Sequence, residues 1–166
     1  MRSKKSMTAC CHPGGFTLIE LLVTLAITAL LATMVVPLAE TSIQRQREQE
    51  LRRALRELRT AIDTYKRATD EGRIPRPVDG TGYPSSLEVL VDGVQDARDP
   101  KKRKIYFLRR IPRDPLHTDS RVPDADTWGK RSYASEASDP QEGADVYDVF
   151  SKSSSTGLNG IAYRRW

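Results

Sequence analysis

The chain has 166 residues, a length that fits one modest globular domain with an appendage and argues against two independent cores. Lys and Arg number 27 against 22 Asp and Glu, and both signs are interleaved through most of the chain. This pattern indicates a soluble surface and not a basic nucleic-acid arm. Only 38% of the residues are hydrophobic, and a large part of them lie in one block near the N-terminus. A large multidomain enzyme is therefore excluded.

The segment before this block is short and basic. Its charged residues are Arg2, Lys4 and Lys5. Both cysteines of the chain, Cys10 and Cys11, also lie here, and adjacent cysteines cannot form an ordinary disulfide. A structural zinc site would need a second, spaced pair of ligands, which the segment lacks. We therefore expect residues 1–15 to be a leader without a structural role.

The apolar block, residues 16–39, contains a single charge, Glu20. As a helix it reaches roughly 36 Å, against a hydrocarbon core of about 30 Å. We predict that it is the membrane-spanning half of a helix, with a kink at Pro37. The basic leader places the N-terminus in the cytoplasm and exports everything after Ala39. A cleaved secretory signal is disfavoured because the block exceeds the usual apolar length of about 7 to 15 residues and no A-x-A site follows.

Glu20 needs a partner, because a carboxylate in this position costs about 2.5 to 3.5 kcal/mol on insertion. No Lys or Arg lies between Pro13 and Ile43, so the helix itself supplies none. Cleavage after Gly15 would create a positively charged amine on Phe16 at the same membrane depth. Between neighbouring helices, the amine of one copy could pair with the carboxylate of another and set their axial register.

The helix is predicted to continue as an amphipathic half over residues 40–72, because apolar residues recur every three or four positions. It should end near Glu71-Gly72, since glycine suits a C-cap and Pro75 cannot continue the pattern. Basic residues along it leave a nucleic-acid patch as an alternative, although interleaved glutamates dilute the field and we expect no nucleic-acid partner. The basic residues are Arg45, Arg47, Arg52, Arg53, Arg56 and Arg59.

Residues 73–166 are predicted to form an exported globular head. We expect a short helix over 85–91, capped by Ser85 or Ser86, and an irregular segment over 92–104. A small antiparallel sheet packed on the amphipathic half would bury both apolar faces, which gives an α+β fold. The expected strands are 131–134, 145–151 with Val146 and Phe150 on one face, and 161–164.

No catalytic residues are predicted. After the leader the chain has one histidine, His117, and no cysteine. No nucleophile motif such as G-x-S-x-G accompanies it, so no base and nucleophile pair can be assigned. We therefore expect a protein that is not an enzyme.

The run Gly15-Phe16-Thr17-Leu18-Ile19-Glu20, after a basic leader and before an apolar stretch, resembles the class III signal of type IV pilins and pseudopilins. The resemblance implies a pilin-like fold. It also implies cleavage between Gly15 and Phe16 by prepilin peptidase and methylation of the new Phe16 amine. Glu20 and Pro37 are assigned to assembly of the processed chain.

Further motifs are similar to those of the major pseudopilin of type II secretion, and only the insertion 116–127 interrupts them. The resemblance implies a structural subunit of a short periplasmic filament that drives protein export, anchored by a single pass in the bacterial inner membrane. The implied partners are other copies, minor pseudopilins, prepilin peptidase and the inner-membrane secretion platform. Alternatives are a type IV pilin, a competence or minor pseudopilin, or a membrane-anchored nucleic-acid binder. The motifs are Gly82-Tyr83-Pro84, Ile111 to Pro115, Trp128-Gly129 and Asp145 to Ser151.

The same resemblance implies calcium in the loop that follows the last of these motifs. Calcium takes about six to eight oxygen ligands, preferably with several carboxylates. The loop 152–160 of this chain has no carboxylate, and Asn159 stands where the family usually has aspartate. We therefore expect no cofactor. If calcium were bound, its nearest ligands would be Asp145, Asp148 and Asn159.

Overall fold

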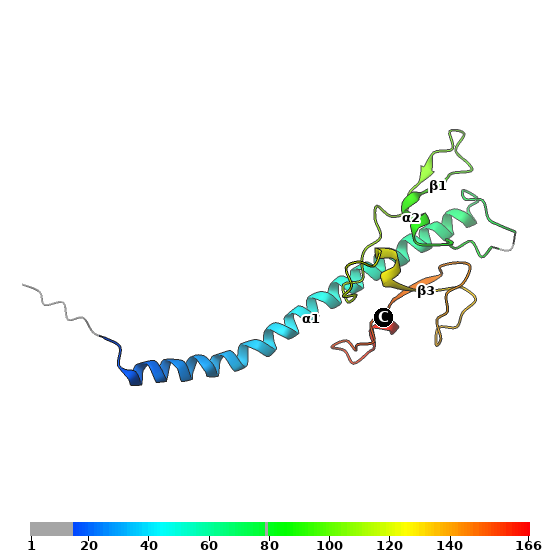
Figure 1. The fold of residues 1–166 in the computed structure, drawn as a ribbon. Coiled ribbons are helices and arrows are strands. Elements are labelled where there is room, and N and C mark those ends of the chain that lie inside the picture. The colour runs from blue at the N-terminus through cyan, green and yellow to red at the C-terminus, as the bar shows by residue number, and fades with distance from the viewer. Residues whose placement is uncertain (1–14, 79) are drawn as a thin grey trace, which may run out of the picture. The chain divides into compact units, whose positions relative to one another are not determined.

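The structure is a computed structural model that describes residues 15–78 and 80–166, except for the side chains of 34–38. A long helix, α1 (Leu18–Asp70), runs uninterrupted from the blue to the green part of the chain (Figure 1). A short helix, α2 (Glu88–Asp92), and two small antiparallel sheets follow it. This architecture confirms the predicted α+β, pilin-like fold. The chain divides into two units, Met1–Ser42 and Ile43–Trp166, here called the N-terminal and C-terminal units.

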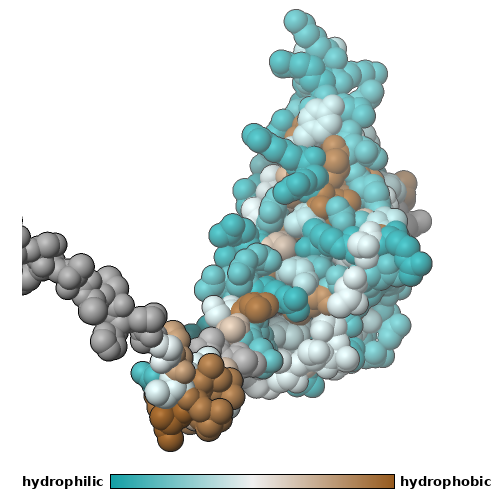
Figure 2. Space-filling view, turned by 60° about the vertical axis from the view of Figure 1, so that its left-hand side comes forward, coloured by the Kyte–Doolittle hydropathy of each residue, from teal (hydrophilic) through white to brown (hydrophobic). Residues whose placement is uncertain are grey.

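In the N-terminal unit the described apolar side chains are exposed, with Phe16 at 87% and Leu18 at 80% (brown in Figure 2). Its threonines satisfy their hydroxyl groups within the helix: Thr28 Oγ1, for example, donates to the carbonyl of Thr24 at 2.7 Å. In the described part of the chain, no helix combines the length and the apolarity that a membrane span requires. The predicted span over 16–39 stays a prediction.

In the C-terminal unit the predicted amphipathic stripe of α1 is confirmed as a core face. Leu51, Leu58 and Ile62 are fully buried, together with Trp128 and Val149 from the sheet. The helix ends where the sequence predicts, in a Schellman motif. Its Gly72 has φ 70°, and the bonds Arg73 N to Ala68 O and Gly72 N to Thr69 O are both 2.9 Å long.

The larger sheet pairs β3 (Trp128–Arg131) with β4 (Asp148–Ser151), with Trp128 opposite Ser151. Gly129 is required here, because a Cβ atom would lie 2.3 Å from the ring of Phe150. The predicted strand 131–134 is wrong, since the chain turns at Ser132, whose N–H donates to the carbonyl of Gln141 at 2.9 Å. Strand β4 begins three residues later than the predicted strand 145–151, because the carboxylate of Asp145 accepts from Ser132 and closes the turn there.

Four further predictions about the head are wrong. Residues 161–164 form no strand; Ala162 makes an isolated bridge to Thr156, and the 3₁₀ turn Tyr163–Arg165 then buries the Tyr163 ring. The segment 92–104 is not wholly irregular: β1 (Val94–Gln95) pairs with β2 (Lys104–Ile105), a pairing too short for the period of a strand to show. Helix α2 starts later than predicted, and no serine caps it. Val146 and Phe150 do not share a face, because Val146 and Val149 are the buried pair.

Candidate functional site

The predicted cleavage site lies directly before α1, and its two residues are exposed among the residues that the structure describes. Gly15 has no heavy atom within 4 Å of the position of a Cβ, and Phe16 is almost fully exposed. Nothing in the described part of the chain shields the bond between them. The predicted leader residues 1–14, including Cys10 and Cys11, lie outside the described residues.

Glu20 forms a capping box with Thr17 at the start of α1. The Thr17 N–H donates to Glu20 Oε2 at 3.0 Å, and the Glu20 N–H donates to Thr17 Oγ1 at 3.3 Å. The Thr17 hydroxyl adds a second bond to the same carboxylate oxygen at 3.0 Å. These bonds satisfy backbone donors that the first turn of a helix otherwise leaves unpaired. Sequence reasoning missed this role, although Thr-x-x-Glu before an apolar run is its known signal.

The capping box does not neutralise the charge of Glu20. Within the described part of the chain this carboxylate forms no ion pair. Cleavage after Gly15 leaves the Thr17 N–H in place, so the box is compatible with the processed chain. The predicted pairing with the Phe16 amine of another copy stays a prediction, as does the role of Pro37. Pro37 is part of α1, but its side chain lies outside what the structure describes.

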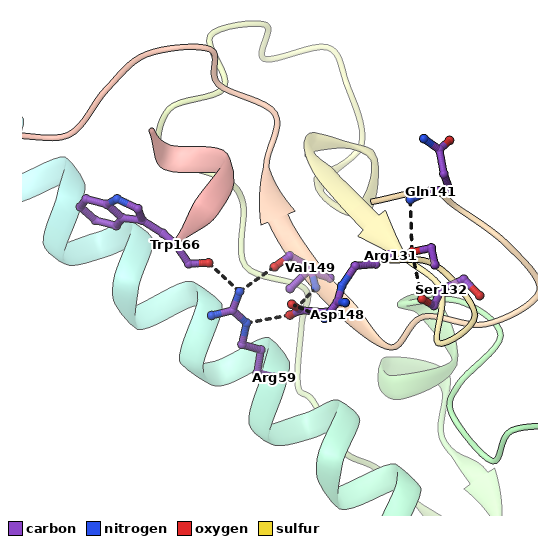
Figure 3. A network of polar contacts seen from close by, with 8 residues as sticks. Arg59, Arg131, Ser132, Gln141, Asp148, Val149 and Trp166 are labelled. Atoms are coloured by element: carbon purple, nitrogen blue, oxygen red, sulfur yellow. Dashed lines mark hydrogen bonds and ion pairs between the residues drawn. The ribbon is translucent and has the colours of Figure 1, made fainter. Parts of the chain in front are cut away.

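The three residues named as calcium ligands belong to separate hydrogen-bond networks. Asp148 faces two guanidinium groups, Arg59 Nε at 2.8 Å and Arg131 Nη2 at 3.3 Å (Figure 3). Asn159 Oδ1 accepts from the Ile161 N–H at 3.0 Å. Asp145 accepts from the Ser132 hydroxyl and from the Tyr133 N–H, both at 2.9 Å, and from the Thr81 hydroxyl.

These residues do not fit a calcium site. The two arginines already compensate the charge of Asp148 and would repel a divalent cation. Among the described residues there is no group of three or more His, Cys, Asp or Glu side chains that could hold a metal ion. Burial of Asp145 disfavours its charged form, but the hydrogen bonds from Thr81, Tyr133 and Ser132 outweigh this and hold its pKa below the usual value.

The C-terminal loop is instead fastened to α1 by a buried glutamate. Glu48 is only 6% exposed, and its Oε1 accepts from the Leu158 N–H at 2.7 Å and from the Tyr163 hydroxyl at 3.0 Å. Burial, together with the nearby Glu48 carboxylate, raises the pKa of Tyr163. The sequence does carry a signal for this contact, because Glu48 falls in phase with Leu51, Leu55 and Leu58 on the core face of the helix.

Arg59 fastens the chain terminus to the same helix. Its Nη2 donates to the Val149 carbonyl at 3.1 Å and to the Trp166 carbonyl at 2.7 Å, besides the ion pair of Nε with Asp148 (Figure 3). Two turns earlier, the Arg52 guanidinium lies over the Trp166 ring, 4.4 Å from its centroid. Two of the six arginines that suggested a nucleic-acid patch, Arg52 and Arg59, therefore make contacts within the protein itself.

The residues before and after the insertion 116–127 lie next to each other. Trp128 Nε1 donates to the Pro112 carbonyl at 2.7 Å, and the Asp114 N–H donates to Thr127 Oγ1 at 3.2 Å. The buried Asp114 carboxylate accepts from the Ser151 hydroxyl at 2.6 Å. The motif residues on either side of the insertion are thus neighbours in space, and β3 keeps its place beside β4.

A long helix with an apolar first half, an open Gly-Phe bond before it and a small α+β unit on its second half define the class of pilin-like subunits. The prokaryotic N-terminal methylation motif matches residues 12–36, which include Gly15, Phe16 and Glu20.

The relatives narrow this class. The type II secretion system core protein G of Pectobacterium carotovorum subsp. carotovorum is 30% identical over 117 residues, which cover 70% of each chain. The protein of that name from Aeromonas hydrophila is 29% identical over 133 residues, 80% of this chain and 87% of the relative. The one from Vibrio cholerae is 27% identical over 134 residues, 79% and 84% of the two chains. The chain therefore belongs to the family of type II secretion system core protein G. No solved structure matches it.

Proposed function

We propose that the protein is made as a precursor, cut between Gly15 and Phe16, methylated on the Phe16 amine and assembled into a short filament that drives protein export. It is a structural subunit of a type II secretion pseudopilus. The observation that carries this function is the match of the methylation motif at the start of a helix whose apolar side chains are exposed.

Assembly has a clear driving force in the N-terminal unit. An isolated copy leaves large side chains such as Leu21, Leu25 and Leu30 more than half exposed, so this surface needs lipid or protein around it. In the filament, the apolar helices of neighbouring copies would pack against one another in place of lipid. A paired Phe16 amine and Glu20 carboxylate would fix the axial register of that packing.

The proposed location is the bacterial inner membrane, with a single pass, the N-terminus in the cytoplasm and the residues after Ala39 in the periplasm. Arg2, Lys4 and Lys5 support this orientation, since basic residues stay on the cytoplasmic side. The proposed partners are prepilin peptidase, the inner-membrane secretion platform, minor pseudopilins and further copies of the chain. A catalytic function is not part of the proposal.

We also propose that the C-terminal loop needs no calcium. The Glu48 carboxylate on α1 accepts a hydrogen bond from the Leu158 N–H of the loop, and Arg59 donates to the Trp166 carbonyl. These internal hydrogen bonds supply the stabilisation that a metal ion would give. A bound cation near Asp148 would compete with two guanidinium groups.

The experiment that tests the function uses the full chain, produced together with prepilin peptidase and a type II secretion platform. Filaments are sheared from the cells, sedimented and seen by electron microscopy, and their N-terminus is determined by mass spectrometry. We expect filaments of chains that begin with methylated Phe16. Retention of residues 1–15 in the filaments, or no filaments at all, would refute the proposal. Gly15→Leu is the control: a Cβ at this position has no heavy atom of a described, non-adjacent residue within 4 Å, so a block in assembly would report processing and not misfolding.

A further inference from the structure

A basic groove runs between the second half of α1 and the segment that follows Phe107. Four arginines border it: Arg53 and Arg56 on the helix, and Arg109 and Arg110 on the segment. We call it the arginine groove. It has a volume of about 880 Å³ and an apolar floor that includes Ala61 and Leu108. A second hollow of about 400 Å³ adjoins it and shares Arg53, Glu57 and Arg110. Glu50 and Asp124 also line this second hollow.

The four arginines of the arginine groove take part in no ion pair among the described residues. All four guanidinium groups are on exposed residues, and none forms a hydrogen bond or an ion pair with any residue that the structure describes. One acidic side chain, Glu57, lines the groove. Clustered charge of one sign along a hollow concentrates the electrostatic potential there. Six other arginines of the same unit are paired with aspartates, namely Arg59, Arg73, Arg103, Arg113, Arg121 and Arg131.

A surface of opposite charge lies in the loop between β3 and β4. Glu136, Asp139 and Glu142 are exposed, and no Lys or Arg occurs from Ser132 to Ser151. In the described structure, none of these three carboxylates takes part in an ion pair. We call residues 135–143 the acidic loop.

The base of the acidic loop is held by hydrogen bonds. The Ser132 N–H bonds to the Gln141 carbonyl at 2.9 Å (Figure 3), and the Asp145 carboxylate accepts from Ser132 and from the Tyr133 N–H. A loop held in this way loses little conformational entropy on binding, which favours its use as a contact surface.

We infer that the arginine groove of one copy receives the acidic loop of a second copy. Within one copy the two surfaces make no ion pair with each other, so each is free to pair with another molecule. A contact between two different surfaces of identical chains is heterologous and continues from copy to copy, which suits an open filament. Charges that become buried at such a contact also fix the relative orientation of the partners. The inference rests on the proposed assembly into a filament and names a contact between its exported units.

Disulfide trapping in the full chain tests the contact. The processed chain has no cysteine, because Cys10 and Cys11 precede the cleavage site. Chains carrying Arg110→Cys and chains carrying Glu142→Cys are produced together, and filaments are oxidised. We expect a disulfide-linked dimer only when both variants are present. The matched control is Arg98→Cys with Glu142→Cys, since Arg98 is equally exposed but lies outside the groove.

Charge reversal provides the second test. Arg53→Glu with Arg110→Glu should lower the yield of sedimented filaments about tenfold or more, because like charges then face each other. Glu136→Lys with Glu142→Lys should have the same effect, and the two changed chains produced together should restore filaments. All four positions are exposed, so thermal unfolding should stay unchanged.

The outcomes separate this inference from the proposed function. Filaments that form without the disulfide, or that tolerate both reversals, would overturn the contact and leave the proposed function standing. An unmodified chain that forms no filaments would overturn both. A third outcome is that the unmodified chain retains DNA in a salt-sensitive way, that Arg53→Glu with Arg110→Glu abolishes this retention, and that filaments are unaffected. This outcome would assign the groove to nucleic acid and overturn the contact.

Discussion

The two units of this chain use one helix in opposite ways. In the N-terminal unit α1 exposes its large apolar side chains, and its described hydrogen bonds stay within the helix. In the C-terminal unit the same helix buries Leu51, Leu58 and Ile62 against the sheet. The difference shows that the second unit carries its own core, whereas the described apolar side chains of the first unit are exposed.

The largest effect is expected from Glu20, which belongs to the N-terminal unit. Glu20→Ala should leave the protein membrane-inserted and reduce filament yield about tenfold or more, since breaking a buried ion pair costs about 3 to 5 kcal/mol. Glu20→Gln separates the two roles of the side chain, because glutamine keeps an acceptor for Thr17 but has no charge. Sheared filament yield is the measurement. Full assembly of Glu20→Gln would show that the cap and not the charge matters.

Leu58→Ala and Leu25→Ala compare the two parts of the helix directly. Leu58 is fully buried, so its truncation should lower the free energy of unfolding of the C-terminal unit by about 2 to 5 kcal/mol. Leu25 is 63% exposed, and its truncation should change that free energy by less than about 0.5 kcal/mol. Urea unfolding of the detergent-solubilised full chain measures both. Equal effects would mean that the two units share one cooperative core.

Glu48→Ala tests whether the C-terminal unit holds its own terminus. The change leaves the Leu158 N–H and the Tyr163 hydroxyl without this acceptor, which should cost about 1 to 3 kcal/mol of unfolding free energy. Hydrogen exchange should increase over residues 156–163. Glu50→Ala, at an exposed position of the same helix, is the control and should have little effect. Unchanged exchange in Glu48→Ala would remove the role assigned to this side chain.

Replacing Asp145 should have a smaller effect on the free energy of unfolding, and this effect should depend on pH. Because its folded pKa lies below the usual value of about 3.9, its stabilising contribution is present above that value and is lost as the pH falls through the folded pKa. Asp145→Asn should therefore destabilise the protein by about 1 to 2 kcal/mol at pH 7 and less at pH 3. Denaturant unfolding at both pH values provides the measurement. A penalty that grows on acidification would contradict the assignment.

Calcium should have the smallest effect. Millimolar calcium and a chelator should give the same melting temperature, since the loop is held by Glu48 and Asp148 is already paired. Ser154→Asp with Asn159→Asp adds two carboxylates and should gain calcium-dependent stability if the loop retains the family geometry. A large shift in the unmodified chain would refute the calcium-free proposal, and no response in either chain would indicate a rebuilt loop.

Local patterns predicted much of this molecule. The period of the apolar residues predicted the buried stripe of α1, and Gly72 before Pro75 predicted its end, because both follow from the geometry of a single helix. The class III signal at Gly15-Phe16 depends on consecutive residues and is likewise readable without a fold. The capping box of Thr17 and Glu20 was equally local and could have been predicted from Thr-x-x-Glu. It was missed because the charge of Glu20 was interpreted only as needing a partner in another copy.

Only the tertiary structure decided how the segments after residue 73 combine. Strands β1 to β4 are two to four residues long, too short for a period of two to define their ends. The long-range partners of Glu48 and Arg59 are 89 to 115 positions away in the sequence, and the Ser151 partner of Asp114 is 37 positions away. A buried charge is stable only where the fold brings such partners within hydrogen-bond distance, and that distance is a property of the packed chain and not of its local sequence.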